Sequence, residues 1–201
     1  MVDYSYVELS SAAMKALMEY RQMFPNTPRA AEIKREIPLG VDFIKRIQRP
    51  DGSWYGSWAV CFTYGTWFGI EALVMAGERV DSPAVLRAVD FLLSKQNSDG
   101  GWGEDFLSCV RKVYVDNEIS QVVNTSWALL ALMAAKTTHR EAVDRGVEFL
   151  MSRQLPNGDW KQESISGVFN GNCSIAYESY KNVFPIWALG RYYTKYNPQK
   201  E

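Results

Sequence analysis

The chain has little of what metal-binding and secreted proteins usually carry. Its 201 residues include one histidine, no CxxC pair and only three cysteines, Cys61, Cys109 and Cys173, which lie far apart. This composition predicts no metal site, and it indicates reduced thiols of an intracellular protein rather than a disulfide framework. A formal net charge of −1, with lysine and arginine scattered along the chain, excludes the basic field of a nucleic-acid-binding protein.

Targeting segments and short catalytic motifs are also missing. The sequence contains no run of about 20 apolar residues that could span a membrane, and its start lacks the basic-then-apolar order of a signal peptide. It contains no GxSxG, Walker or dinucleotide-binding motif. His139 lies in a polar connector, which predicts a solvated loop residue rather than a general base. Glu104 and Asp105 are adjacent, so in a helix they would face different directions, and we expect a structural role for them.

What the chain does contain is one pattern in three copies, around residues 40–54, 88–102 and 146–160. Each copy ends in a glutamine followed six residues later by a tryptophan: Gln48 and Trp54, Gln96 and Trp102, Gln154 and Trp160. The copies begin 48 and 58 residues apart, and a period near 50 predicts repeated units that stack to bury their apolar faces. We expect each glutamine to bond a neighbouring helix end and each tryptophan to pack over it.

Two kinds of helix alternate between these copies. Amphipathic helices are expected over 29–48, 83–96 and 140–154, and nearly uncharged helices over 64–77, 124–135 and 184–190. Pro38 is expected to break or kink the first of them. Because a helix that is apolar all round is buried on all sides, the alternation predicts an inner layer of apolar helices and an outer amphipathic layer. With about seven helices, the fold class is all-α, an arc of an α/α toroid rather than a closed ring.

Aromatic residues gather in the segments that connect the outer to the inner helices, at 57–68, 167–170 and 175–177. For any single ring, packing in the core is a sufficient explanation. The alternative is a dry cavity walled by π faces, each of which would stabilise a nearby cation by about 0.5–2 kcal/mol.

Several long stretches resemble the terpene cyclase/mutase family, in particular the C-terminal part of an oxidosqualene cyclase of the lanosterol synthase type. They are GSWAVCFTYGTWFGIEA, DGGWGEDFLSC, QLPNGDW, GVFNGNCSIAY and SYKNVFPIWALGRY, and the three Gln/Trp repeats match the QW motifs of that family. The resemblance implies two α/α barrels, with residues 1–201 as the C-terminal portion of the second. It also implies cyclisation of 2,3-oxidosqualene through carbocations, without metal or cofactor, by an enzyme held on one leaflet of the endoplasmic reticulum or a lipid droplet.

The resemblance assigns roles to single residues. It implies that Trp58 and Phe169 line the substrate cavity, with Ile175 and Tyr177 close to its wall. The family's protonating Asp-Cys-Thr-Ala motif does not occur in the chain, and His139 does not match the family's cavity histidine. Both would lie upstream of Met1, so we expect the upstream part of the enzyme as a partner and no activity from this chain alone.

One position departs from the family pattern, and two alternatives stay open. Val-Glu-Cys-Thr, usual in the family, is here Val-Glu-Leu-Ser, so Leu9 stands where a cysteine would hydrogen-bond the protonating Asp. The first alternative is a truncated, non-catalytic relative. The second is another α/α toroid, such as a prenyltransferase β-type subunit, which one histidine and isolated cysteines disfavour because such a subunit needs zinc ligands. The sequence does not give the product skeleton.

Overall fold

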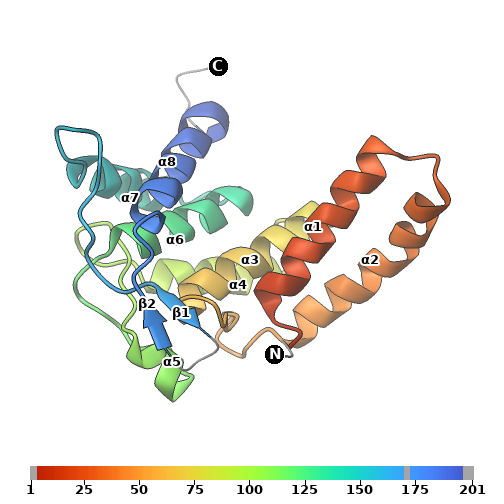
Figure 1. Ribbon diagram of the computed structural model, residues 1–201, viewed down its shortest axis with the longest axis horizontal. Helices are drawn as coiled ribbons and strands as arrows, with labels where there is room; N and C mark the ends of the chain where they lie inside the picture. Colours follow the sequence, from red (N-terminus) through yellow and green to blue (C-terminus); the bar gives the residue numbers. More distant parts are fainter. Residues whose placement is uncertain (1–3, 170–172, 197–201) are drawn as a thin grey trace.

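Eight α-helices and one small hairpin make up the part of the chain that the computed structural model describes, residues 4–169 and 173–196 (Figure 1). The helices are α1 (Val7–Met23), α2 (Pro28–Arg46), α3 (Cys61–Met75), α4 (Pro83–Ser94), α5 (Leu107–Arg111), α6 (Val122–Ala134), α7 (Arg140–Ser152) and α8 (Tyr180–Arg191), which continues into a π-helical turn, η1 (Tyr192–Tyr196). Strands β1 (Gly167–Phe169) and β2 (Cys173–Ile175) pair antiparallel, with Gly167 opposite Ile175. Met1 and Asn170 lie outside the described residues.

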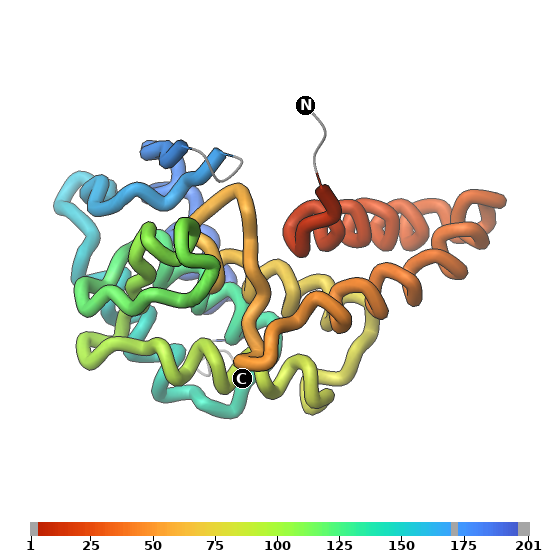
Figure 2. Tube along the Cα trace, turned by 90° about the horizontal axis from the view of Figure 1, so that it is seen from below, coloured from red at the N-terminus to blue at the C-terminus, as the bar shows by residue number. Residues whose placement is uncertain are grey.

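The helices form the two predicted layers. Helices α1, α3, α6 and α8 pack in series as the inner layer, while α2 lies against α1 and α3, α4 against α3 and α6, and α7 against α6 (Figure 1). Figure 2 shows α1 and α2 extending together from the rest of the molecule as a pair. Twelve of the 15 residues of α3 and twelve of the 13 of α6 are buried, as expected for uncharged inner helices. The arc of an α/α toroid is therefore confirmed.

Helix α8 is an exception to the predicted burial. Its apolar sequence predicts a helix buried on all sides, yet Val183, Ile186 and Trp187 are exposed. The reason is its place at one end of the arc, where it packs against α6 but no further inner helix of the described chain covers its other side. The sequence predicted about seven helices, one fewer than the eight in the described residues. The five-residue α5 has too few residues to show a helical period.

Pro38 does not break α2, although the sequence predicted a break or a kink at this position. The helix runs without interruption from Pro28 to Arg46, and the Thr27 hydroxyl oxygen caps its first turn by accepting a hydrogen bond from the Ala30 N–H. Pro38 removes one backbone donor from the helix interior. Buried Ile33 and Ile44 on the two sides of Pro38 anchor both halves of the helix, so tertiary packing outweighs the local cost.

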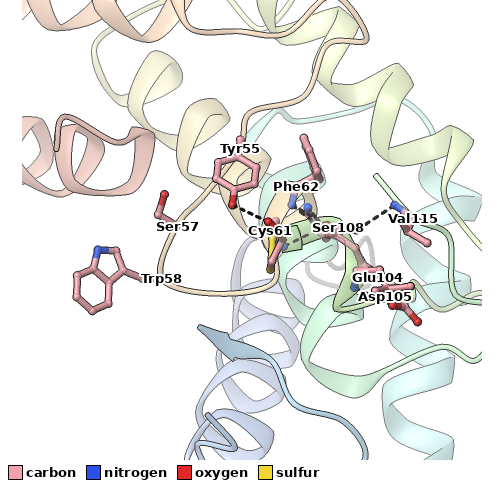
Figure 3. The surroundings of a disulfide bond; sticks show 12 residues. Tyr55, Ser57, Trp58, Cys61, Phe62, Glu104, Asp105, Ser108 and Val115 are labelled. Carbon is pink, nitrogen blue, oxygen red and sulfur yellow. Dashed lines mark hydrogen bonds between the residues drawn. A yellow bond between two sulfur atoms is a disulfide. The ribbon is translucent and has the colours of Figure 1, made fainter. Parts of the chain in front are cut away.

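The expectation of three reduced thiols is wrong for two of them. Cys61 and Cys109 are joined by a disulfide (Figure 3), with their Cα atoms 6.0 Å apart. Cys173 is free and exposed. The pair is 48 residues apart in sequence. Stacking of the repeats brings them together, because the segment after the second repeat lies against the beginning of α3.

The repeats connect the outer helices and their turns through one recurring set of hydrogen bonds. The indole N–H groups of Trp54, Trp102 and Trp160 donate to the carbonyl oxygens of Ile44, Leu92 and Leu150, each ten residues earlier, at 2.7–2.9 Å. Gln48 donates to the Gly52 and Ala84 carbonyls, and Gln96 to those of Gly100 and Ala142. Gln154 donates to the Gly158 carbonyl. In the first two copies, each glutamine thus links its own turn to the first turn of the next outer helix.

Candidate functional site

Trp58 and Phe169, which are 111 positions apart in the chain, meet in the structure. Their rings pack edge to face, with centroids 5.3 Å apart and planes at 76°. The backbone arranges this contact: the Val168 N–H donates to the Trp58 carbonyl at 3.2 Å, and the Val60 N–H donates to the Ser166 carbonyl at 2.9 Å. The hairpin therefore lies alongside the loop before α3, and Phe169 remains 37% exposed.

Ile175 is the last residue of the other strand of the same hairpin, and Tyr177 follows it by two residues. Opposite residues of an antiparallel pair share a face, so Ile175, opposite Gly167, lies on the same face as Phe169. Tyr177 packs over Gly167, where any side chain would collide with its ring. The Tyr177 ring also lies 4.8 Å from that of Tyr180 at the start of α8. All four predicted cavity residues therefore lie on the hairpin or in the segments beside it, and among these four the Trp58–Phe169 pair is in direct ring contact.

A second group of aromatic residues runs across the inner helices, and most of them lie outside the aromatic connecting segments of the sequence. Tyr64 and Trp127 lie 5.1 Å apart, Trp127 and Phe184 5.3 Å, and Trp67 and Trp187 5.2 Å between ring centroids. These edge-to-face contacts connect α3, α6 and α8. The sequence indicates Tyr64 and Trp67 through the aromatic segment 57–68, and the other three only through the aromatic content of helices that carry no charge or almost none.

Carboxylates from distant segments cap two of the inner helices, α3 and α6. Helix α3 begins after Val60, whose side chain offers no cap. Glu104 supplies one by accepting hydrogen bonds from the Cys61, Phe62 and Thr63 N–H groups at 2.9–3.1 Å (Figure 3). Burial raises the pKa of Glu104, and these donors act in the opposite direction. The predicted structural role of Glu104 thus takes a definite form, and Glu163 caps α6 similarly at the Val122 N–H.

A cavity of about 750 Å³ lies at the opposite, C-terminal ends of α3 and α6. Inside it, buried Glu71 pairs with Lys15 of α1 at 3.0 Å and with Arg191 of α8 at 2.5 Å. Burial by itself would raise the pKa of Glu71, but the Arg191 and Lys15 cations hold it below its usual value. None of the four predicted cavity residues lines this space. Through these two ion pairs, Glu71 of α3 connects α1 and α8, the two ends of the inner layer.

Glu71→Gln is expected to lower the free energy of unfolding at pH 7 by about 3 kcal/mol, because it leaves two cations facing an uncharged group. A carboxylate whose folded pKa is depressed stabilises the protein above its unfolded pKa, about 4.3, and that stabilisation is lost as pH falls through the folded value. The difference between native and variant in urea unfolding should therefore shrink below about pH 4. A gap that stays constant from pH 7 to pH 3 would contradict this role for Glu71.

His139 is an exposed residue at the beginning of α7, as predicted. Among the residues that the structure describes, no group of histidine, cysteine and acidic side chains is arranged to hold a metal ion. In the same residues, no helix is both long and apolar enough to cross a bilayer.

The architecture defines an α/α toroid of the terpene cyclase type. It matches ent-copalyl diphosphate synthase from Streptomyces platensis with a TM-score of 0.71 over 94% of this chain and 34% of that one, at 19% identity. It matches the type II terpene cyclase MstE from Scytonema with a TM-score of 0.59 over 84% of this chain and 41% of that one, at 21% identity. At these identities the likeness shows the fold alone.

Sequence comparison identifies the family. Residues 1–194 match the squalene-hopene cyclase C-terminal domain, and the chain belongs to that family. It is 60% identical to cycloartenol synthase from Dictyostelium discoideum over 100% of this chain and 28% of that protein. It is 55% identical to human lanosterol synthase over 96% of this chain and 27% of that protein. The chain therefore spans just over a quarter of the length of these relatives.

Proposed function

We propose that this chain forms the C-terminal portion of the second α/α barrel of an oxidosqualene cyclase and supplies part of the aromatic wall of its substrate cavity. The observation that carries the proposal is the Trp58–Phe169 pair, held at the N-terminal ends of the inner helices by backbone hydrogen bonds. Identity of 55–60% to cycloartenol and lanosterol synthases supports 2,3-oxidosqualene as the substrate and a sterol or triterpene skeleton as the product. The family match disfavours the prenyltransferase alternative.

In this proposal the chain stabilises cations and does not begin the reaction. A face or edge of Trp58 or Phe169 near a developing carbocation would lower its free energy by about 1–2 kcal/mol in a dry site. The proton that opens the epoxide would come from an aspartic acid outside this sequence, and neither metal nor cofactor is required. The upstream part of the enzyme is then the partner that completes the cavity. A peripheral place on one leaflet of the endoplasmic reticulum or a lipid droplet belongs to the same proposal.

A hybrid enzyme tests this function. The chain would replace the segment that it matches in the Dictyostelium cycloartenol synthase, which is 28% of that protein. The hybrid, incubated with 2,3-oxidosqualene, is expected to release cyclised alcohols detected by gas chromatography and mass spectrometry. The unaltered relative is the positive control, and a hybrid lacking the upstream protonating aspartate is the negative control. A folded hybrid that yields no cyclised product would reject the proposal.

The same assay addresses the alternative of a non-catalytic relative. The 201-residue chain alone should give no cyclised product, because it lacks the acid and leaves Val183, Ile186 and Trp187 open to water. Activity of the hybrid together with inactivity of the chain alone supports the proposed function. If the hybrid folds but does not act, the non-catalytic alternative is favoured.

Leu9→Cys in the active hybrid is expected to raise turnover without changing the product. A cysteine there could donate a hydrogen bond to the conjugate base of the protonating aspartate, which lowers the pKa of that acid and makes it a stronger proton donor. A gain of about one pKa unit would raise kcat by up to roughly tenfold. Leu9→Ser serves as a weaker donor for comparison, and Leu9→Val as a control without a donor. Equal turnover in all four enzymes would show that Leu9 does not limit initiation.

A further inference from the structure

Two buried carboxylates bind the loop between the first repeat and α3 from opposite sides. Glu104 binds its C-terminal end, at the first turn of α3, as described above. Glu8, in the first turn of α1, binds the other end: its Oε1 accepts hydrogen bonds from the Ser57 N–H at 2.5 Å and the Trp58 N–H at 3.1 Å. Glu8 is 3% exposed and Glu104 is 1% exposed. Both act across more than 40 residues of sequence.

A carboxylate in the first turn of a helix usually caps that helix or interacts with its dipole. Glu8 occupies such a position, and the side chain of Tyr6, the N-cap residue of α1, makes no capping hydrogen bond. The Glu8 carboxylate reaches instead to a neighbouring segment, and one of the two amides that it binds is that of Trp58. Hydrogen bonds to a charged acceptor are stronger than those to a neutral one, so two of them restrict the backbone from which the indole projects.

We infer that Glu8 is a positioning residue for Trp58, fixing the indole against Phe169, whereas Glu104 stabilises α3 without setting that orientation. The inference rests on the proposed function only in the consequence that it draws for catalysis. Figure 3 shows the division: Glu104 lies beside Cys61 and Phe62, while the Trp58 side chain lies at the far end of the loop and points away from the disulfide. A displaced indole would no longer be held at 5.3 Å from the Phe169 ring.

The test uses the complete 201-residue chain labelled with 5-fluorotryptophan. Its seven tryptophans give separate fluorine resonances, and Trp58→Phe assigns one of them. Glu8→Leu removes the acceptor, Glu8→Asp withdraws it by one methylene group, and Glu8→Gln keeps an uncharged oxygen in its place. Glu104→Gln is the matched control at the other end of the loop.

In Glu8→Leu and Glu8→Asp, the Trp58 resonance is expected to shift towards the position that it has in the unfolded chain. In Glu8→Gln, it is expected to lie close to its native position. The Trp54 and Trp102 resonances should stay in place. In Glu104→Gln the Trp58 resonance should stay, while the urea midpoint falls. A Trp58 resonance that keeps its native position in every Glu8 variant that folds would overturn the inference. So would movement of all seven resonances together, or failure of all three Glu8 variants to fold, because Glu8 would then serve the fold as a whole.

The hybrid enzyme separates this inference from the proposed function. If Glu8→Asp moves the Trp58 resonance and also increases early-deprotonated products several-fold, both stand. If it moves the resonance but leaves the products unchanged in an active hybrid, Glu8 still positions Trp58, but the cavity role proposed for Trp58 fails. An unmoved resonance overturns the positioning role, whatever the hybrid produces.

Discussion

Gly69→Ala should lower the free energy of unfolding by about 3 kcal/mol. Gly69 lies on α3 against the indole of Trp54, and a Cβ atom there would stand closer to the ring carbons than van der Waals contact allows. Because Trp54 is fully buried and bonded to the Ile44 carbonyl, the ring has no free space in which to move. Overpacking of this kind typically costs 1–3 kcal/mol and sometimes more. For a chain of this length, that is a fall in Tm of about 6–12 °C.

Gly190→Ala provides the matched control. It is also a glycine in a helix, but a Cβ atom there would meet nothing within 4 Å. Alanine is the better helix former, so this substitution should leave Tm unchanged or raise it slightly. In a double variant, Gly69→Ala with Trp54→Phe, the smaller ring makes room for the added methyl group. The free energy lost on Gly69→Ala should therefore be smaller in the Trp54→Phe background than in the native chain. Equal effects of the two glycine substitutions would refute the close contact between α3 and the repeat.

Periodic burial explains why the layers could be predicted from the sequence. Helices α3 and α6 lack charged residues apart from Glu71, whereas α4 and α7 each have one polar and one apolar face. The sequence of each helix therefore indicates whether it lies in the inner or the outer layer. The equal spacing from glutamine to tryptophan likewise predicts the same local geometry in all three copies of the repeat. These signals are local, and they need no knowledge of which segments meet.

The features that the sequence did not reveal all depend on contacts between distant segments. The Cys61–Cys109 disulfide and the Glu104 cap both require the segment after the second repeat to lie on the start of α3. The unbroken α2 depends on packing on both sides of Pro38, and the exposure of α8 on its place at the end of the arc. The contact between Trp58 and Phe169 was not predicted either, although the family resemblance singled out both residues.

Phe169→Leu in the active hybrid should change the products while the protein stays folded. Leucine keeps much of the bulk of phenylalanine but has no π face, so a carbocation near residue 169 would lose about 1–2 kcal/mol of stabilisation. That amount shifts the partition between competing steps by about tenfold. Prematurely deprotonated products should therefore increase by about that factor relative to the product of the unaltered hybrid. Residue 169 is 37% exposed in this chain, so the cost in stability should be small.

Trp54→Phe is the opposite case and completes the comparison. It removes the indole N–H that donates to the Ile44 carbonyl and leaves a void in a fully buried site, so Tm should fall. The product pattern should remain that of the unaltered hybrid, because Trp54 lies between α2 and α3 in the scaffold and not beside Phe169. Product analysis and thermal unfolding of both variants together test which residue acts in the cavity and which in the scaffold. If Phe169→Leu affects only Tm and Trp54→Phe changes the products, the assignment of cavity and scaffold residues is wrong.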